Sequence, residues 1–268
     1  MKFPAFRLTV ALITLFLFAL VAAPSALAAE ERVGVVLLHG KTGSPGIFSG
    51  GVVEPLKQAG FLVETPEMSW SRGRYIDKTY DEALNEIDAA AARLAARGAT
   101  KIVIAGHSMG GDAALAYGAY HGNIAAVILL APGHIPDWPG MKRDFADGVA
   151  RAKAMVDAGH GNDFASFPDT NMGKDYVRTM KAAIYFSFFD PDGVGAAAKN
   201  ATNLSPAIPV LYVAGSADPL TRLMGQSFIF SKLPPNPLTK YVVVEADHLG
   251  TPAAAVGEMI PWLRALAQ

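Results

Sequence analysis

The sequence predicts an α/β fold with a mostly parallel sheet of about six strands and helices on both faces. Two observations support this prediction. Short apolar runs recur along the chain, which is typical of strands buried on both faces of a sheet. Helical patterns lie between them, so strands and helices alternate. The runs are residues 33–38, 101–105, 125–130, 209–213 and 241–244, with a weaker one at 61–64.

Local end signals identify two of the helices. Residues Thr79 to Glu82 match a capping box, and Gly98 follows the last apolar position of the same helix. The final helix opens at Thr251 with proline as its next residue, and Pro261 is expected to bend it. Both segments are predicted to be packing elements.

Between residues 134 and 205 the alternation of strands and helices fails. This stretch contains an amphipathic helical pattern near 142–158, a segment rich in Gly, Asn and Asp, and an aromatic cluster at 185–189. It is too short to form an independent domain. We therefore expect a helical cap insertion at about residues 134–205 of a single catalytic domain that spans residues 29–268.

Composition excludes several functional classes. The chain has 268 residues, of which 51% are hydrophobic, and 23 Lys and Arg balance 24 Asp and Glu. Without a basic run, no nucleic-acid partner is expected. The chain has no cysteine, so it has neither disulfides nor a thiol nucleophile. It also lacks a histidine and carboxylate motif at ligand spacing, and we expect neither a metal nor another cofactor.

The N-terminal segment has the layout of a secretory signal peptide. Lys2 and Arg7 precede an apolar run at residues 8–23, and the small-residue site Ala26-Leu27-Ala28 follows. An uncleaved anchor is the alternative, but the run is shorter than the roughly 20 residues that cross a bilayer. The sequence predicts cleavage after Ala28, export to the periplasm or the extracellular space, and no stable membrane insertion afterwards.

A G-x-S-x-G motif marks the candidate nucleophile. Gly106, Ser108 and Gly110 follow the apolar run at 101–105 and precede a helix-like segment at 112–120. A strand that turns sharply into a helix exposes the serine hydroxyl above the edge of the sheet. A bare motif occurs by chance and can be a structural turn, but this strand and helix context indicates a nucleophile elbow.

With this motif, residues 33–268 resemble the α/β-hydrolase superfamily of serine esterases and lipases. In that superfamily, the acid follows the strand after the cap and the histidine follows the final strand. Asp218 and His248 occupy these two places. The resemblance therefore implies a catalytic triad of Ser108, Asp218 and His248.

The chemistry of each group agrees with this assignment. A serine hydroxyl needs a base to accept its proton, and imidazole is suited to that role near neutral pH. The other five histidines are expected to be solvated or packed in the core. A carboxylate must orient the imidazole, and Asp218 has two rivals. They are Asp247, next to the histidine, and Asp137, after the strand at 125–130.

Two backbone N–H groups are needed to bind the oxyanion of a tetrahedral intermediate. The resemblance assigns them to Met109, after the nucleophile, and to Lys41, in the loop after the first strand. Lysine at this place departs from the small or aromatic residues that are commoner in the family. Its side chain is expected to reach solvent.

The lead reaction is hydrolysis of a carboxylic ester, with a small-molecule acyl substrate, through an acyl-enzyme. A peptidase or a thioesterase would share the same triad, and a non-catalytic binding protein is a third alternative. An apolar face of the cap that includes Phe145, together with Phe188 of the aromatic cluster, is predicted to cover the acyl pocket. The alternative is that these residues only pack the cap onto the sheet.

Overall fold

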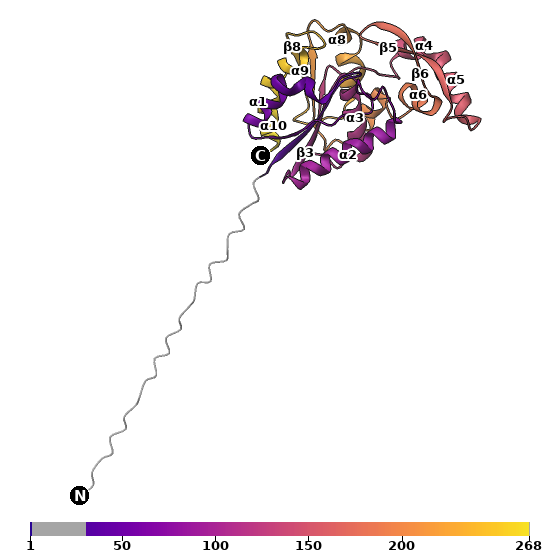
Figure 1. Cartoon of the computed structure of the whole chain (residues 1–268). Helices are drawn as coiled ribbons and strands as arrows, with labels where there is room; N and C mark the ends of the chain where they lie inside the picture. Colours follow the sequence, from indigo (N-terminus) through magenta and orange to yellow (C-terminus); the bar gives the residue numbers. More distant parts are fainter. Residues whose placement is uncertain (2–30, 268) are drawn as a thin grey trace. The chain divides into compact units, whose positions relative to one another are not determined.

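A computed structural model of the chain describes Met1 and residues 31–267, and the predicted signal peptide therefore lies outside the described residues except for Met1. Residues 31–267 are arranged around one sheet (Figure 1). Six parallel strands pair in the order β2-β1-β3-β4-β7-β8. This confirms the predicted parallel sheet. The strands are β1 (Val33–Leu38), β2 (Leu62–Glu64), β3 (Lys101–His107), β4 (Ala126–Leu130), β7 (Val210–Gly215) and β8 (Lys240–Val244).

Alternate side chains of each strand enter two different hydrophobic clusters. Val36 and Leu38 face one side of β1, while Val35 and Leu37 face the other. This is the two-residue period of a strand that is buried on both faces. Helices cover both clusters. The cluster that contains Val35 and Leu37 is covered by α1 (Glu54–Gln58), α9 (Thr251–Ala254) and α10 (Val256–Leu266). The cluster that contains Val36 and Leu38 is covered by α2 (Tyr80–Ala96), α3 (Met109–His121) and α7 (Ala197–Asn203).

The helix α2 begins and ends where its local signals predict. The Glu82 carboxylate accepts a hydrogen bond from the Thr79 backbone N–H at 2.8 Å, and the Thr79 hydroxyl accepts one from the Glu82 N–H at 3.4 Å. Two otherwise free N–H groups are thereby satisfied. Gly98 has a φ of +91°, which glycine adopts readily after a helix C-terminus. The predicted final helix, which opens at Thr251, is divided at Ala255 into α9 and α10, and Pro261 lies inside α10.

Shorter helical turns connect these elements. They are a 3-10 turn at Pro45–Phe48, a π-helical turn at Ser49–Val53, helix α8 (Pro219–Leu223), a second π-helical turn at Gly225–Ile229 and a 3-10 turn at Phe230–Lys232. Helix α8 is short, and Asp218 is its N-cap. The Asp218 side chain accepts a hydrogen bond from the backbone N–H of Leu220. Within residues 31–267, no helix has both the length and the apolar character needed to span a bilayer.

The cap after β4 is not purely helical. The predicted helix at 142–158 is divided at Phe145, and the segment rich in Gly, Asn and Asp forms an antiparallel hairpin. Met172 and Gly173 at its tip both have positive φ, as in the tight two-residue turns that suit a hairpin. The cap elements are α4 (Pro139–Asp144), α5 (Ala146–Asp157), β5 (Phe164–Asn171), β6 (Lys174–Lys181) and α6 (Ala182–Phe189).

The C-terminal part of the predicted insertion belongs to the helical layer of the sheet. Helix α7 packs against α3, and its Ala197 and Ala201 are buried in the same cluster as the α2 and α3 side chains. It is therefore the crossover helix between the parallel strands β4 and β7. The elements that extend beyond the sheet are α4, α5, the hairpin and α6.

Candidate active site

Ser108 lies at the sharp turn between β3 and α3. Its φ of 54° and ψ of −122° are strained for a residue with a side chain. A Cβ atom at Gly106 would overlap the backbone of Gly110, and one at Gly110 would lie 2.5 Å from the carbonyl oxygen of Leu38. Only glycine fits at these two positions. The Ser108 side chain does not cap α3, so its hydroxyl is free for another role.

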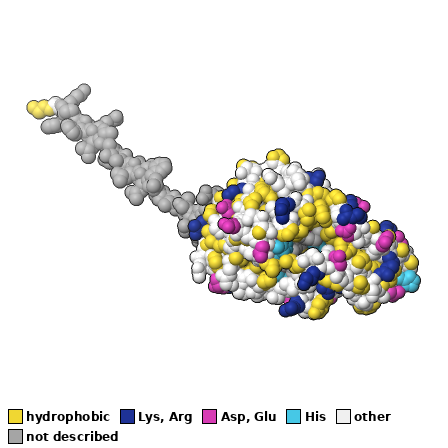
Figure 2. Space-filling view, turned by 90° about the horizontal axis from the view of Figure 1, so that it is seen from above, with side chains coloured by type: hydrophobic (Ala, Val, Ile, Leu, Met, Phe, Trp, Pro, Cys, Tyr) yellow, Lys and Arg dark blue, Asp and Glu magenta, His cyan; other side chains and the backbone are white. Residues whose placement is uncertain are grey.

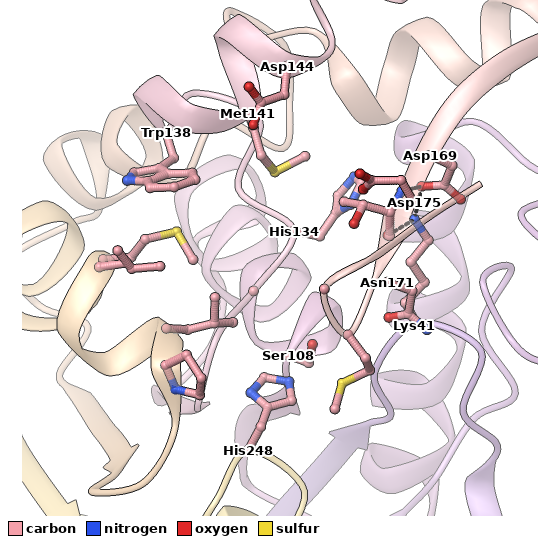
Figure 3. A pocket seen from close by; sticks show the side chains of 18 of the residues that line it. Lys41, Ser108, His134, Trp138, Met141, Asp144, Asp169, Asn171, Asp175 and His248 are labelled. Atoms are coloured by element: carbon pink, nitrogen blue, oxygen red, sulfur yellow. Dashed lines mark hydrogen bonds and ion pairs between the residues drawn. The ribbon is translucent and has the colours of Figure 1, made fainter. Parts of the chain in front are cut away.

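His248 and Asp218 come from the loops after β8 and β7, and they are hydrogen-bonded. The Nδ1–H of His248 donates to Oδ2 of the buried Asp218 at 2.7 Å. The other carboxylate oxygen accepts from the backbone N–H of Leu220 at 2.9 Å, at the start of α8. With Nδ1 protonated, Nε2 of His248 is the ring nitrogen that can accept a proton. Ser108 and His248 line the same cavity (Figure 3).

The two rival carboxylates have other partners. The exposed Asp247 accepts a hydrogen bond from the backbone N–H of Gly250 at 2.7 Å, which orders its own loop. Asp137 accepts from the backbone N–H groups of Ala197 and Ala198, at 3.0 and 2.8 Å, and so caps α7. Among the described residues, Asp218 is the carboxylate that contacts His248.

His107 is a site residue that was not predicted. Its Nε2–H donates to the backbone carbonyl of His248 at 2.8 Å, and the two rings are 4.8 Å apart. Burial lowers the pKa of His107 to about 4, so the ring is neutral near pH 7. A neutral ring with one N–H can hold the His248 loop without adding charge. Its position directly before Ser108 was the available sequence signal.

Lys41 and Met109 are the two residues to which the resemblance assigns the oxyanion-binding N–H groups. Met109 is the first residue of α3, where N–H groups have no partner inside the helix. Within residues 31–267, the N–H of Lys41 donates to no backbone acceptor. A Cβ atom on Gly40 would lie 3.0 Å from the Ser108 Cβ, so this loop lies beside the elbow.

The side chain of Lys41 does not reach solvent, and that prediction is wrong. It is 4% exposed, forms an ion pair with Asp169 of β5, and donates to the carbonyl oxygen of Thr170 at 3.0 Å. Burial lowers the Lys41 pKa, and the Asp169 carboxylate opposes that shift. The lysine is buried because the unpredicted hairpin covers the loop and supplies the opposite charge.

The cavity has a volume of about 640 Å³, which suits a small-molecule ligand. In the face drawn in Figure 2, histidine atoms are visible in a hollow bordered by hydrophobic side chains. The hairpin contributes polar groups to one wall, including Thr170, Asn171 and Asp175. The apolar part of the wall includes Trp138, Met141, Phe145, Leu220, Leu223 and Met224.

The two predicted cap residues occupy different places. Phe145, between α4 and α5, lines the cavity. Phe188 is fully buried and packs against Tyr80 and Trp70, at ring distances of 4.8 and 6.4 Å. The structure therefore assigns Phe188 to the core rather than to the cavity wall.

His134 also lines the cavity. Its Nε2–H donates to the carbonyl of Phe188 at 2.9 Å, and burial, reinforced by the charge of Lys41, lowers its pKa to about 3. The ring is therefore neutral and presents Nδ1 as an acceptor. Within residues 31–267, no three His, Asp or Glu side chains are grouped so that they could hold a metal ion.

The fold and the sequence both define the class of this protein. A model of the alpha/beta hydrolase family matches residues 35–260, so the chain belongs to this family. The search of curated proteins finds no match.

Three solved structures illustrate the likeness. A monoacylglycerol lipase from Paleococcus ferrophilus is 23% identical, with a TM-score of 0.61 over 87% of this chain and 94% of that one. A thermostable carboxyl esterase from Bacillus coagulans is 14% identical, with a TM-score of 0.63 over 89% and 91%. Est1E from Butyrivibrio proteoclasticus, with ferulic acid bound, is 23% identical, with a TM-score of 0.59 over 88% and 91%. At these identities the likeness shows the fold.

Proposed function

We propose that the protein is a serine hydrolase that cleaves a carboxylic ester through an acyl-enzyme. The observation that carries the proposal is the bond between Asp218 and His248, 2.7 Å long, in the loops next to the strained Ser108. A non-glycine residue whose backbone is held in a strained conformation beside a cavity is a signal of function. The names of two of the solved structures, a monoacylglycerol lipase and a carboxyl esterase, favour an ester as the substrate.

The reaction follows from the position of each group. The Nε2 of His248 takes the proton of Ser108 Oγ while that oxygen attacks the carbonyl carbon of the ester. The carbonyl oxygen becomes an oxyanion and accepts hydrogen bonds from the N–H groups of Lys41 and Met109. When the tetrahedral intermediate collapses, His248 gives the proton to the departing alcohol, and the acyl group stays on Ser108.

Water completes the cycle. His248 removes a proton from a water molecule as that water attacks the acyl-enzyme, and it then returns the proton to Ser108 when the carboxylic acid leaves. Asp218 stabilises the imidazolium, and its hydrogen bond keeps the proton on Nδ1 of His248.

The first prediction concerns the nucleophile. Intact-mass analysis after treatment with a fluorophosphonate should show one covalent adduct, and Ser108→Ala should show none and hydrolyse no 4-nitrophenyl butyrate. The same panel should include a butyryl thioester and an amide, because these substrates distinguish an esterase from a thioesterase or a peptidase. Labelling that persists in Ser108→Ala would remove this residue from its proposed role.

The second prediction separates the two neighbouring carboxylates. Asp218→Asn should lower kcat by about 10³–10⁴-fold, since the amide no longer holds the imidazole in its productive tautomer. Asp247→Asn is the matched control, and its kcat should stay within about tenfold of the wild type. Steady-state kinetics on one ester measures both. If Asp247→Asn lost more activity than Asp218→Asn, the acid would have to be reassigned.

The third prediction concerns the acyl pocket. Phe145→Ala should change the dependence of kcat/KM on acyl chain length, because each methylene that loses contact with Phe145 forfeits up to about 0.8 kcal/mol. Phe188→Leu, a milder change of a core residue, should lower the thermal midpoint and leave that dependence unchanged. The assay is a series of 4-nitrophenyl esters from acetate to octanoate. The same chain-length profile in wild type and Phe145→Ala would exclude Phe145 from the pocket.

We also propose that the protein is exported and cleaved after Ala28. The charged start, the apolar run and the small-residue site of the sequence support this. N-terminal sequencing of protein from an extracytoplasmic fraction should begin at Ala29. Full-length protein with Met1 in the membrane fraction would indicate an anchor instead.

A further inference from the structure

The tip of the cap hairpin is joined to the loop that carries one oxyanion donor. Asp169 pairs with the Lys41 side chain, and the carbonyl of Thr170 accepts from the same ammonium group. The Nδ2 of Asn171 donates to the hydroxyl of Thr42 at 3.1 Å. Three consecutive residues of β5 thus contact two consecutive residues of the loop, and Figure 3 shows Asp169, Asn171 and Lys41 together at one side of the cavity.

The Asp169 carboxylate is completely buried and fully hydrogen-bonded. Besides Lys41, it accepts from Nε of Arg178 at 2.7 Å and from the backbone N–H of Thr170 at 2.8 Å. A buried ion pair gains little net stability over apolar residues, but the loss of one partner leaves an uncompensated charge and is strongly unfavourable. The Lys41 side chain is therefore restricted to one position, opposite Asp169.

The same residue that makes this buried pair also provides the oxyanion donor. Backbone hydrogen bonds of 2.9 Å also hold the loop around it: Thr42 N–H donates to the Trp70 carbonyl, Gly43 N–H to the Gly40 carbonyl and Arg72 N–H to the Gly43 carbonyl. The Gly40 carbonyl belongs to the same peptide group as the Lys41 N–H and also lies 2.8 Å from Nδ1 of His39, so hydrogen bonds within the loop orient this peptide group. The side chain of Lys41 adds the contacts that join this donor to the cap hairpin.

We propose that Asp169 is a positioning residue for catalysis: through Lys41 it holds the oxyanion donor in place, so that docking of the cap hairpin and completion of the oxyanion hole are one event. The inference rests on the function proposed above. It differs from a role in shaping the pocket, because the effect is transmitted to the reacting carbonyl of every ester, whatever its acyl chain.

Two esters with acyl chains of different length distinguish a positioning role from a role in shaping the pocket. Asp169→Asn should lower kcat about 10–100-fold for both 4-nitrophenyl acetate and 4-nitrophenyl hexanoate, since a misplaced oxyanion donor weakens the transition state of each. KM should change less than threefold. The inhibition constant of phenylboronic acid, whose tetrahedral adduct uses the same donors, should rise by the same factor as kcat falls.

A second variant covers the case in which Asp169→Asn does not fold. Lys41→Met keeps the backbone N–H and leaves Asp169 paired with Arg178, and it should show the same equal loss on the two esters. Asp157→Asn is the matched control, because it breaks the exposed pair of Lys153 and Asp157 on α5 of the same cap. Its kinetics should equal those of the wild type.

The outcomes are distinct. A loss confined to the hexanoate ester would show that the pair only shapes the pocket, and unchanged kinetics in both variants would overturn the proposal. Failure of the proposed function would appear separately, as ester hydrolysis that persists in Ser108→Ala. In that case hydrogen exchange still tests the anchor: the peptide that contains residues 40–43 should exchange faster in Lys41→Met than in Asp157→Asn, and equal exchange would overturn it.

Discussion

The close approach of three backbone segments at Ser108 is the constraint on which the site depends. The end of β3, the first turn of α3 and the loop after β1 meet there, and side chains at Gly106 or Gly110 would overlap neighbouring backbone. The turn places Ser108 at a positive φ, which costs of order 1–3 kcal/mol and persists only if its surroundings enforce it. The buried parallel sheet supplies that enforcement through the paired strands β1, β3 and β4.

The proposed base and acid, His248 and Asp218, lie on loops, which are intrinsically less restrained than strands. Their hydrogen bonds compensate for this. Asp218 is held by the first N–H of α8, and the backbone of His248 is held by His107, the residue that precedes the nucleophile. The neutral state of His107 matters for the proposed mechanism, because a cation 4.8 Å from the His248 ring would oppose formation of the imidazolium. The turn that carries the proposed nucleophile therefore also restrains the proposed base.

Local signals were sufficient to predict the sheet, the capped helix α2 and the positions of Ser108, Asp218 and His248. Apolar strand runs and capping residues are signals that extend over only a few residues. The places of the acid and the histidine follow from the chain order of the family. The burial of Lys41 depended instead on Asp169, which is 128 residues away and lies on a hairpin with little hydrophobic alternation. Phe188 was assigned to the pocket for a related reason: its aromatic cluster is apolar on several sides, and only the tertiary contacts show which side faces the cavity.

The contact between the cap hairpin and the loop after β1 is made by a buried charge pair, Lys41 and Asp169. An apolar contact of a hairpin tip can slide, since hydrophobic contacts have little directionality. A buried carboxylate with three donors has one arrangement that leaves no charge unpaired, so it specifies the register between β5 and the loop. A cap held in this way supplies the cavity with a wall of fixed position. Because Lys41 belongs to both this contact and the loop of the proposed oxyanion donor, the proposal couples the position of that wall to the catalytic geometry.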